Sequence, residues 1–450
     1  MSRGEANRPT LIYSVSAGLI LIYLSENVNN RQITKIKQIG IEAMKKPELL
    51  APGGSLEKLK TAILYGADAV YIGGEAFSLR VAAENFSKED MLEGIKFAHD
   101  RGKKVYLTAN ILPHNSDIDD FENFITEIKD YGFDAVLVAD IGLFDMLQEL
   151  APQIPIHIST QANNINYRSA IKWHKMGAKR VVLAREMSFK EIAEFHNKIP
   201  EDLELEAFIH GAMCISYSGR CLLSNYMTGR DSNMGACAHP CRWNYKLVEE
   251  TRPGEYMDVF ENERGTFIFN SKDLCTIRHI PELVRSGIAS LKIEGRVKTS
   301  YYVATVVGAY RREIDRYFED PDNYVLNETE YEELCKVSHR PYTTGFYFGK
   351  PDESSQVYTS SSYIRDYDLI GIVQSYDEST GILTVSQRNR FFKGDEIEII
   401  QPMKPFFNQV IDCMTDENGN EIDVANHAEQ IVKFKINKPV GEGAMLRKKK

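Results

Sequence analysis

One phrase recurs through the first two thirds of this sequence and restricts its fold more than any other feature. A glycine stands a few residues before a short apolar run in YGADAVYIG, YGFDAVLVAD, MGAKRVVLA and SGIASLKIEG. A glycine at that point can end a helix in the left-handed conformation and turn the chain into a buried strand. The repetition predicts alternating strands and helices, and it favours a closed TIM-like (β/α) barrel over an open sheet.

The alternation begins at Pro47, where short apolar, β-branched runs separate longer amphipathic stretches. Such runs predict the strands of a parallel sheet. We place them at Glu48–Ala51, Ala69–Gly73, Lys104–Ala109, Ala135–Ala139, Ile156–Thr160, Arg180–Ala184, Leu205–His210, Thr266–Asn270 and Ser290–Ile293.

The sequence divides into four parts. Residues 1–43 are an extension without a predicted role; their apolar run Leu11–Leu24 is too short to span a membrane, and no clear cleavage site follows it. Residues 44–318 form the predicted barrel, with a cysteine-rich insertion at 211–265. Residues 319–362 are a linker region, and the period-two pattern of 363–450 predicts a small C-terminal β-barrel.

Composition excludes several classes of protein. The hydrophobic fraction of 43% and the charged fraction of 26% are typical of soluble globular proteins. The net charge of -10 argues against a uniformly basic nucleic-acid coat, although it allows a local basic patch. Because the sequence lacks a convincing secretion signal and its cysteines are spaced like metal ligands, we expect a cytoplasmic protein.

Five of the seven cysteines lie within 62 residues, separated by six, fifteen, three and thirty-three residues: Cys214, Cys221, Cys237, Cys241 and Cys275. Disulfides are disfavoured in the expected compartment. Structural zinc usually shows paired Cys-x-x-Cys knuckles, which this spacing does not provide. An iron–sulfur cluster needs only four thiolates that converge from loops. We therefore favour a cluster, with zinc as the alternative.

In a (β/α) barrel, chemistry gathers at the C-terminal ends of the strands. Each side chain there either takes part in a site or merely caps a helix or satisfies a loop amide. Glu294 and Arg296 are the strongest pair, with a structural salt bridge as the alternative. The candidates at predicted strand ends are Asn110, Asp140, Thr160, Gln161, Arg185, His210, Asn270, Lys272, Glu294 and Arg296.

The stretch EAFIHGAMCISYSGRCLLS, Glu206–Ser224, resembles the signature of peptidase family U32. The segments PELLAPGGSLEKLKTAILYGADAVYIGG, FSLRVAAENFS, HISTQANN, GACAHPCRW, NSKDLC and LKIEGR agree with it, so the resemblance spans about Pro47–Arg312, and SHRPYTTGFYFG continues it. The family is named for collagenase-like proteolysis, yet several members resemble oxygen-independent hydroxylation enzymes that carry a [4Fe-4S] cluster. This sequence is most similar to the members that hydroxylate tRNA.

The resemblance implies formation of 5-hydroxyuridine at the wobble position, with the tRNA anticodon loop as partner and prephenate as hydroxyl source or required metabolite. It also makes a homologous partner subunit plausible. By motif, the cluster ligands are Cys214, Cys221, Cys241 and Cys275. Cys237 is a surplus thiol that either replaces Cys241 or acts as a nearby redox or catalytic group.

Catalytic candidates are His210, Glu294 and Arg296, and a guanidinium can grip a carboxylate bidentately. The alternative activity is a peptidase in which Cys214 is the nucleophile and His210 the base, although no GxSxG elbow or HExxH helix is present. Candidate substrate-binding residues are Arg80, Gln161, Arg185, Lys272 and Arg242, the last of these beside Trp243, where an unstacked base could rest.

Overall fold

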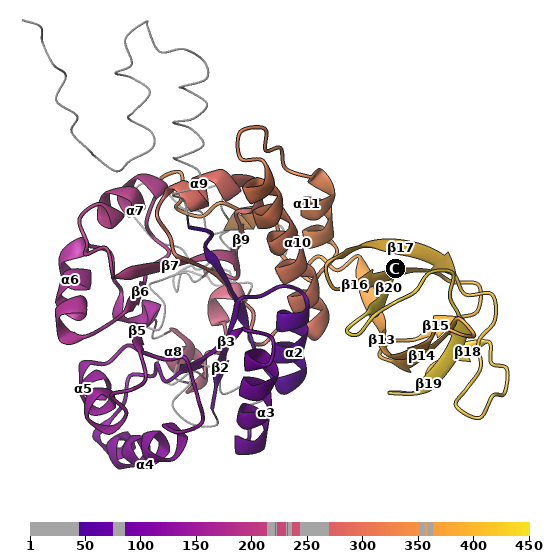
Figure 1. Cartoon of the computed structure of the whole chain (residues 1–450), viewed down its shortest axis with the longest axis horizontal. Helices are drawn as coiled ribbons and strands as arrows, with labels where there is room; N and C mark the ends of the chain where they lie inside the picture. The colour runs from indigo at the N-terminus through magenta and orange to yellow at the C-terminus, as the bar shows by residue number, and fades with distance from the viewer. Residues whose placement is uncertain are drawn as a thin grey trace, which may run out of the picture. The chain divides into compact units, whose positions relative to one another are not determined.

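The computed structural model describes residues 45–74, 86–213, 221, 223–230, 232, 236–243, 270–350, 356–357 and 363–450. Eight parallel strands form its central barrel (Figure 1). Strand β10 pairs with β1 on one side and with β7 on the other, which closes the ring. The strands are β1 (Glu48–Pro52), β2 (Ala69–Gly73), β3 (Lys104–Thr108), β4 (Ala135–Val138), β5 (Ile156–Ile158), β6 (Arg180–Val182), β7 (Glu204–Gly211) and β10 (Ser290–Ile293).

These eight strands confirm the predicted barrel. The ninth predicted strand, Thr266–Asn270, lies outside the described residues except at Asn270. That residue opens a two-residue strand, β8 (Asn270–Ser271), which pairs with β12 (Gln356–Val357) rather than with the barrel.

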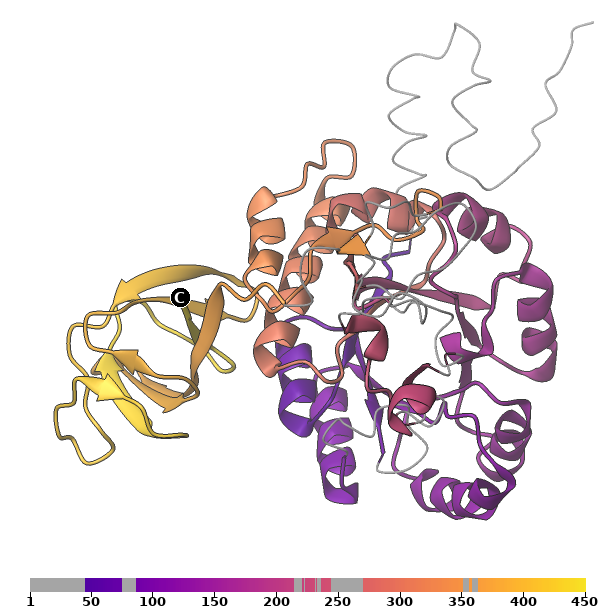
Figure 2. The same cartoon turned by 180° about the vertical axis from the view of Figure 1, so that it is seen from behind.

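Helices surround the strands in a ring that both faces of the molecule show (Figures 1 and 2). Serine side chains cap the N-termini of several of these helices. Ser55, Ser87 and Ser188 each accept a hydrogen bond from the backbone amide three residues later in the chain. The helices are α2 (Leu56–Leu64), α3 (Lys88–His99), α4 (Ile118–Ile128), α5 (Ile141–Leu150), α6 (Tyr167–Met176), α7 (Phe189–His196), α9 (Ile280–Arg285) and α10 (Ser300–Glu319).

The recurring glycines act as the sequence predicted. Gly66, Gly132, Gly177 and Gly287 have φ values of 105°, 95°, 114° and 82°, the left-handed region that other residues avoid. A side chain at Gly287 would also strike the His196 ring, 2.4 Å from the added Cβ atom. These positions therefore require glycine where a helix gives way to the next strand.

One strand departs from the parallel order. Strand β9 (Asp273–Cys275) follows the insertion and runs antiparallel to β7, and β11 (Tyr342–Thr343) extends it. In register, His210 lies opposite Cys275 and Gly211 opposite Leu274. The sequence pattern did not indicate this strand, which brings the end of the insertion against the C-terminal end of β7.

The C-terminal region forms an antiparallel sheet with its own apolar core, as the period-two pattern predicted. Six strands pair in the order β17-β16-β20-β13-β14-β19. Alternate side chains such as Leu383, Val385, Ile397 and Ile399 are fully buried in that core. The strands are β13 (Tyr367–Asp377), β14 (Ile382–Gln387), β16 (Glu396–Gln401), β17 (Lys404–Val410), β19 (Ile431–Lys435) and β20 (Met445–Lys449), with β15 (Phe391–Phe392) and β18 (Val424–Ala425) paired separately.

A buried ionic cluster joins this sheet to helix α11 (Glu328–Cys335). The fully buried side chain of Arg447 on β20 lies 2.6 Å from a Glu333 carboxylate oxygen, and its Nε donates to Glu398 at 2.7 Å. Lys336 donates to Glu398 at 2.9 Å. In the part of the chain that the structure describes, no helix combines the length and the apolar character that crossing a membrane requires.

Candidate active site

A small pocket lies at the C-terminal ends of the barrel strands. Its volume is about 50 Å³, which accommodates a carboxylate-sized group and not a ring compound. Six of the predicted rim residues meet there, namely Asn110, Thr160, Gln161, Arg185, Glu294 and Arg296. The full lining is Tyr71, Thr108, Asn110, Ser159, Thr160, Gln161, Arg185, Phe208, Lys292, Glu294 and Arg296.

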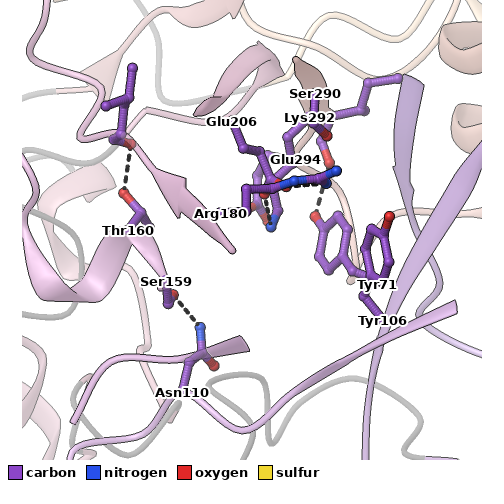
Figure 3. Close-up of polar contacts among 12 residues, drawn as sticks. Tyr71, Tyr106, Asn110, Ser159, Thr160, Arg180, Glu206, Ser290, Lys292 and Glu294 are labelled. Carbon is purple, nitrogen blue, oxygen red and sulfur yellow. Dashed lines mark hydrogen bonds and ion pairs between the residues drawn. The ribbon is translucent and has the colours of Figure 1, made fainter. Parts of the chain in front are cut away.

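The turn after β5 places the amide side of the pocket. Ser159 begins a short 3₁₀ helix, η3 (Thr160–Ala162), and its hydroxyl oxygen accepts hydrogen bonds from the Gln161 amide at 3.5 Å and from Asn110 Nδ2 at 3.0 Å. Thr160 donates to the Leu183 carbonyl at 3.1 Å (Figure 3). These bonds join the ends of β3, β5 and β6, so the polar groups of the pocket are held by the barrel itself.

Two arginines give the pocket its positive charge. Arg185 donates to the Ala212 carbonyl at 2.6 Å and lies 3.4 Å from a Glu294 carboxylate oxygen. Its guanidinium also stacks 4.0 Å from the centre of the Phe208 ring. Arg296, which is buried, donates to the Thr108 hydroxyl at 3.2 Å. The ion pair of Glu294 at this mouth is thus with Arg185.

Some polar atoms of this pocket have no hydrogen-bond partner among the described residues. They include Asn110 Oδ1 and Arg185 Nε, both shielded from solvent. Buried polar atoms normally have a partner, because leaving one unpaired costs about 1–3 kcal/mol. An acceptor beside Arg185 and a donor beside Asn110 would satisfy both, and a bound polar ligand supplies such groups.

A chain of largely buried ion pairs runs through the barrel interior to the pocket (Figure 3). Arg180 contacts Glu48 at 2.6 Å and Glu206 at 3.1 Å, and Lys292 contacts Glu206 at 2.7 Å. Burial alone would raise the pKa of Glu48, but the positive charge of Arg180 outweighs burial and holds this pKa below its ordinary value. These ion pairs were not predicted from the sequence. The signal that could have indicated them was the presence of charged residues at alternate positions within apolar strands.

His210 lies outside this pocket because β7 contains a bulge. Lys292 pairs with Phe208, but the next residue, Ile293, pairs with His210, so β7 carries one extra residue. An extra residue reverses the side-chain alternation that follows it. His210 consequently packs among Tyr302, Tyr310 and Tyr342, with ring centres 5.3 to 6.0 Å away.

Burial governs the protonation of this second cluster. It lowers the pKa of His210 to about 3, with His339 and Lys298 adding to the effect, so the imidazole is neutral. Burial likewise raises the pKa of the Cys275 thiol to about 12. The Tyr310 hydroxyl lies 3.4 Å from His210 Nδ1 and 3.9 Å from Cys275 Sγ. A thiolate at Cys275 therefore needs a bound cation to stabilise it.

The structure places the remaining candidate residues in different ways. Cys214 and Arg80 lie outside the described residues. Lys272 is half-buried between β8 and β9, and Arg242 ends the short helix η5 (Pro240–Arg242). Within the described residues, no three His, Cys, Asp or Glu side chains gather closely enough to hold a metal ion.

Three of the cysteines share a local geometry. Cys221 Sγ accepts a hydrogen bond from the Leu223 amide at 3.4 Å, and Cys237 Sγ accepts one from the His239 amide at 3.4 Å. An Ile277 backbone amide likewise bonds to Cys275. An amide two residues downstream that donates to sulfur stabilises a thiolate, which suits a ligand of an iron–sulfur cluster. The amide bonds at Cys221, Cys237 and Cys275 are thus of the kind that cluster ligands accept.

Comparison with known proteins identifies the family. The model of peptidase family U32 matches residues 54–357, and the model of its C-terminal domain matches residues 365–447. The chain belongs to peptidase family U32. This confirms the resemblance that the signature indicated, and it covers both the barrel and the C-terminal sheet.

Relatives of this U32 chain carry names that concern RNA. The tRNA hydroxylation protein P1 of Bacillus subtilis (strain 168) is 46% identical over 90% of this chain and 96% of its own length. The tRNA hydroxylation protein P of Escherichia coli (strain K12) is 37% identical, over 85% and 92%. The 23S rRNA 5-hydroxycytidine C2501 synthase of the same E. coli strain is 35% identical, over 61% of this chain and 40% of its own.

Proposed function

We propose that this chain is a tRNA hydroxylase that converts the wobble uridine to 5-hydroxyuridine, with a [4Fe-4S] cluster and prephenate. The observation that carries the proposal is the similarity, over nine tenths of the chain, to a protein named for tRNA hydroxylation. The rRNA relative, named for 5-hydroxycytidine, supports hydroxylation at carbon 5 of a pyrimidine. A cytoplasmic location and a homologous partner subunit belong to the same proposal.

The pocket supports a role for a small acid. Hydroxylation replaces the uridine C5–H bond by C5–OH, which removes two electrons from the base. If prephenate is the hydroxyl donor, its C–OH becomes C–H, so the acid gains the two electrons that uridine loses. Arg185 and Arg296 offer a carboxylate charge-assisted hydrogen bonds in a site where water is largely excluded. Gln161 and Asn110 add neutral polar groups that can orient it.

Catalytic roles follow from position. Glu294 and Arg296 face the pocket, so they contact the acid or the base directly. His210 lies behind the pocket wall and next to Cys275, so its proposed role is to pack against the cluster region as a neutral imidazole. Arg242, Lys272 and Arg80 remain proposed contacts for the anticodon loop, because cations and an adjacent aromatic such as Trp243 suit an unstacked base.

Cys214, Cys221, Cys237 and Cys275 would hold the cluster, which supplies one-electron transfer when bound. We choose Cys237 for the fourth ligand, and the downstream amide bond that its sulfur accepts, like those at Cys221 and Cys275, supports this choice. This assignment departs from the motif-based one, in which Cys241 was the ligand.

Nucleoside analysis tests the function. We would delete the gene in its host, hydrolyse total tRNA and measure 5-hydroxyuridine by mass spectrometry, then restore the gene on a plasmid. Loss of the nucleoside on deletion and its return on restoration are expected. Unchanged 5-hydroxyuridine would contradict the proposal. In parallel, the chain purified without oxygen should contain about four irons and matching sulfide. Zinc instead, together with peptide cleavage, would support a peptidase.

A further inference from the structure

We propose that Lys292 forms the floor of an anion site in the barrel pocket and that its ammonium group binds the carboxylate of the small acid. The inference rests on the proposed function for the identity of that acid as prephenate. The binding chemistry itself, an ammonium group and a guanidinium group that line one pocket, rests on the contacts of the barrel residues.

Lys292 is placed where an acid entering the pocket would end. It lies on β10 two residues after Ser290 and two residues before Glu294, which lines the same pocket (Figure 3). Its side chain is only 5% exposed and lines the pocket. The ammonium nitrogen lies 4.4 Å from the centre of the Tyr71 ring and 5.5 Å from that of Phe208. The ammonium group thus lies between aromatic rings that also line the pocket.

Glu206 fixes the lysine and is itself fixed. One oxygen of Glu206 accepts from Lys292 at 2.7 Å, and the other accepts from Arg180 at 3.1 Å. Arg180 is anchored in turn by Glu48, which also accepts from the Tyr106 hydroxyl at 2.6 Å. An ammonium group has three N–H bonds, so the one given to Glu206 leaves others for a ligand.

These buried ion pairs need an explanation other than the stability of the fold. Two buried cations, Arg180 and Lys292, contact three carboxylates: the fully buried Glu206, the largely buried Glu48 and the more exposed Glu204. Apolar side chains of the same volume would stabilise the folded chain equally or better. A buried chain of ion pairs therefore does not by itself raise the free energy of unfolding. Its position is informative, because one end opens into a pocket that Lys292, Arg185 and Arg296 line.

Arg185 completes the site. Its side chain is 8% exposed, it lines the same pocket, and its Nε has no acceptor among the described residues. A carboxylate between Lys292 and Arg185 would satisfy that donor and gain a second charge-assisted bond. The volume of about 50 Å³ holds the carboxylate alone, so the rest of the acid extends toward the strand ends, where the reacting carbon must meet the base.

Two substitutions on the same ion pair separate binding from structure. Lys292→Met removes the ammonium group, whereas Glu206→Gln keeps it and removes only the carboxylate that holds it. We would measure prephenate and phenylpyruvate binding to the full chain by calorimetry, with phenylacetone as a probe that lacks a carboxylate. The unmodified chain is expected to bind the acids and not phenylacetone. Lys292→Met should weaken binding about thirtyfold, since losing a charged hydrogen bond costs about 2 kcal/mol.

Glu206→Gln should keep the affinity for the acid within a few-fold, because the ammonium group remains. Equal losses in the two variants would overturn the inference, since they would show that the pair only supports the fold. It would equally be overturned if the unmodified chain bound no acid, even while the nucleoside analysis still showed 5-hydroxyuridine. The nucleoside result thus tests the function, and calorimetry tests the site.

Controls keep the test interpretable. Lys104→Met removes an exposed lysine at the first residue of strand β3, which is not a neighbour of β10, and should leave binding unchanged. Thermal unfolding of each variant shows whether it folds. If Lys292→Met does not fold, the double variant Lys292→Met with Glu206→Gln removes both charges together, and weak binding by this folded protein is the expected result. Full binding by the double variant would overturn the inference.

Discussion

His210 and Cys275 lie directly opposite each other across the antiparallel pairing of β7 with β9. The Tyr310 hydroxyl closes the group: it donates to the Ile209 carbonyl at 2.9 Å and accepts from the Thr276 amide at 3.0 Å. The extra residue in β7 turns the histidine out of the barrel, and β9 brings the cysteine to meet it. The barrel pocket and the cysteine region therefore share one strand and lie on opposite sides of it.

Removing the Tyr310 hydroxyl should destabilise the chain. Tyr310→Phe removes a fully buried hydroxyl that bonds to the Ile209 carbonyl and to the Thr276 amide. Because that amide also donates to the Ile209 carbonyl at 3.2 Å, the expected cost is about 1 kcal/mol. Urea unfolding followed by circular dichroism measures the loss. Tyr226→Phe is the matched control, since the Tyr226 side chain is 85% exposed and should change little. Equal stability of the two variants would show that the buried hydroxyl contributes nothing.

The buried His157 should make stability depend on pH. Burial, reinforced by Arg180 and Lys292, lowers the pKa of His157 well below its ordinary value, so the folded chain keeps it neutral. Below pH 6.5 the unfolded chain binds one more proton at this residue, and the free energy of unfolding falls as the pH falls. From pH 7.5 to 5.5 the loss from one such histidine is about 1.3 kcal/mol.

The substitution His157→Phe tests this origin. Phenylalanine retains a ring against Tyr106, whose centre lies 5.0 Å from that of the histidine, but it cannot take a proton. The variant should therefore lose about 1 kcal/mol less than the natural chain between the two pH values. Urea titrations at both pH values give the comparison. The same acid sensitivity in both proteins would assign it to other groups.

A methyl group at Gly54 should disturb the pocket. A Cβ atom built there would lie 1.9 Å from the Arg296 carbonyl oxygen, so the loop that carries Arg296 must move. Gly54→Ala should cost about 1–3 kcal/mol in stability and weaken acid binding, because overpacking shifts the backbone. Gly441→Ala is the control, since nothing lies within 4 Å of its added Cβ. Normal acid binding by Gly54→Ala would mean that the loop adapts without moving Arg296.

The junction of the C-terminal sheet with α11 should depend on Arg447. Arg447→Met leaves the carboxylates of Glu333 and Glu398 with Lys336 as their remaining cation, and breaking a buried ion cluster typically costs about 3–5 kcal/mol. Thermal unfolding should show a lowered midpoint. Lys450 follows the end of β20, and its side chain is half-exposed. Lys450→Met should therefore leave the midpoint unchanged. A similar midpoint for both variants would show that the cluster does not hold the junction.

The barrel could be predicted from signals that are local in the sequence, whereas features that depend on pairing between distant strands could not. The glycines at 66, 132, 177 and 287 mark helix ends by their own conformational freedom, so the repeat was readable from neighbouring residues alone. The rim residues followed because strand ends converge in any such barrel. The bulge in β7 was not readable, since it depends on register with β10, more than 80 residues away along the chain.

Charged residues in strands gave a partial signal. Arg180, Glu206 and Lys292 interrupt apolar runs at positions that alternation directs inward, yet a barrel interior filled with ions is rarely expected from hydrophobic pattern. Whether such residues pair with one another depends on which strands are neighbours around the ring. The prediction of His210 as a rim residue used only its place at a strand end, and the bulge moved its side chain to the other side.

The choice between Cys237 and Cys241 is open to direct test. Spacing left both as candidates, and the amide bond from His239 to Cys237 Sγ gives Cys237 the local geometry of Cys221 and Cys275. Cys237→Ser should therefore lose most of the iron and sulfide of the anaerobically purified chain, since a cluster with three thiolates is held weakly. Cys241→Ser should keep both, and it is the matched control because the substitution and the loop are the same. Iron retained by Cys237→Ser but lost by Cys241→Ser would return the assignment to Cys241, and the hydrogen bond at Cys237 would then serve only to order the loop.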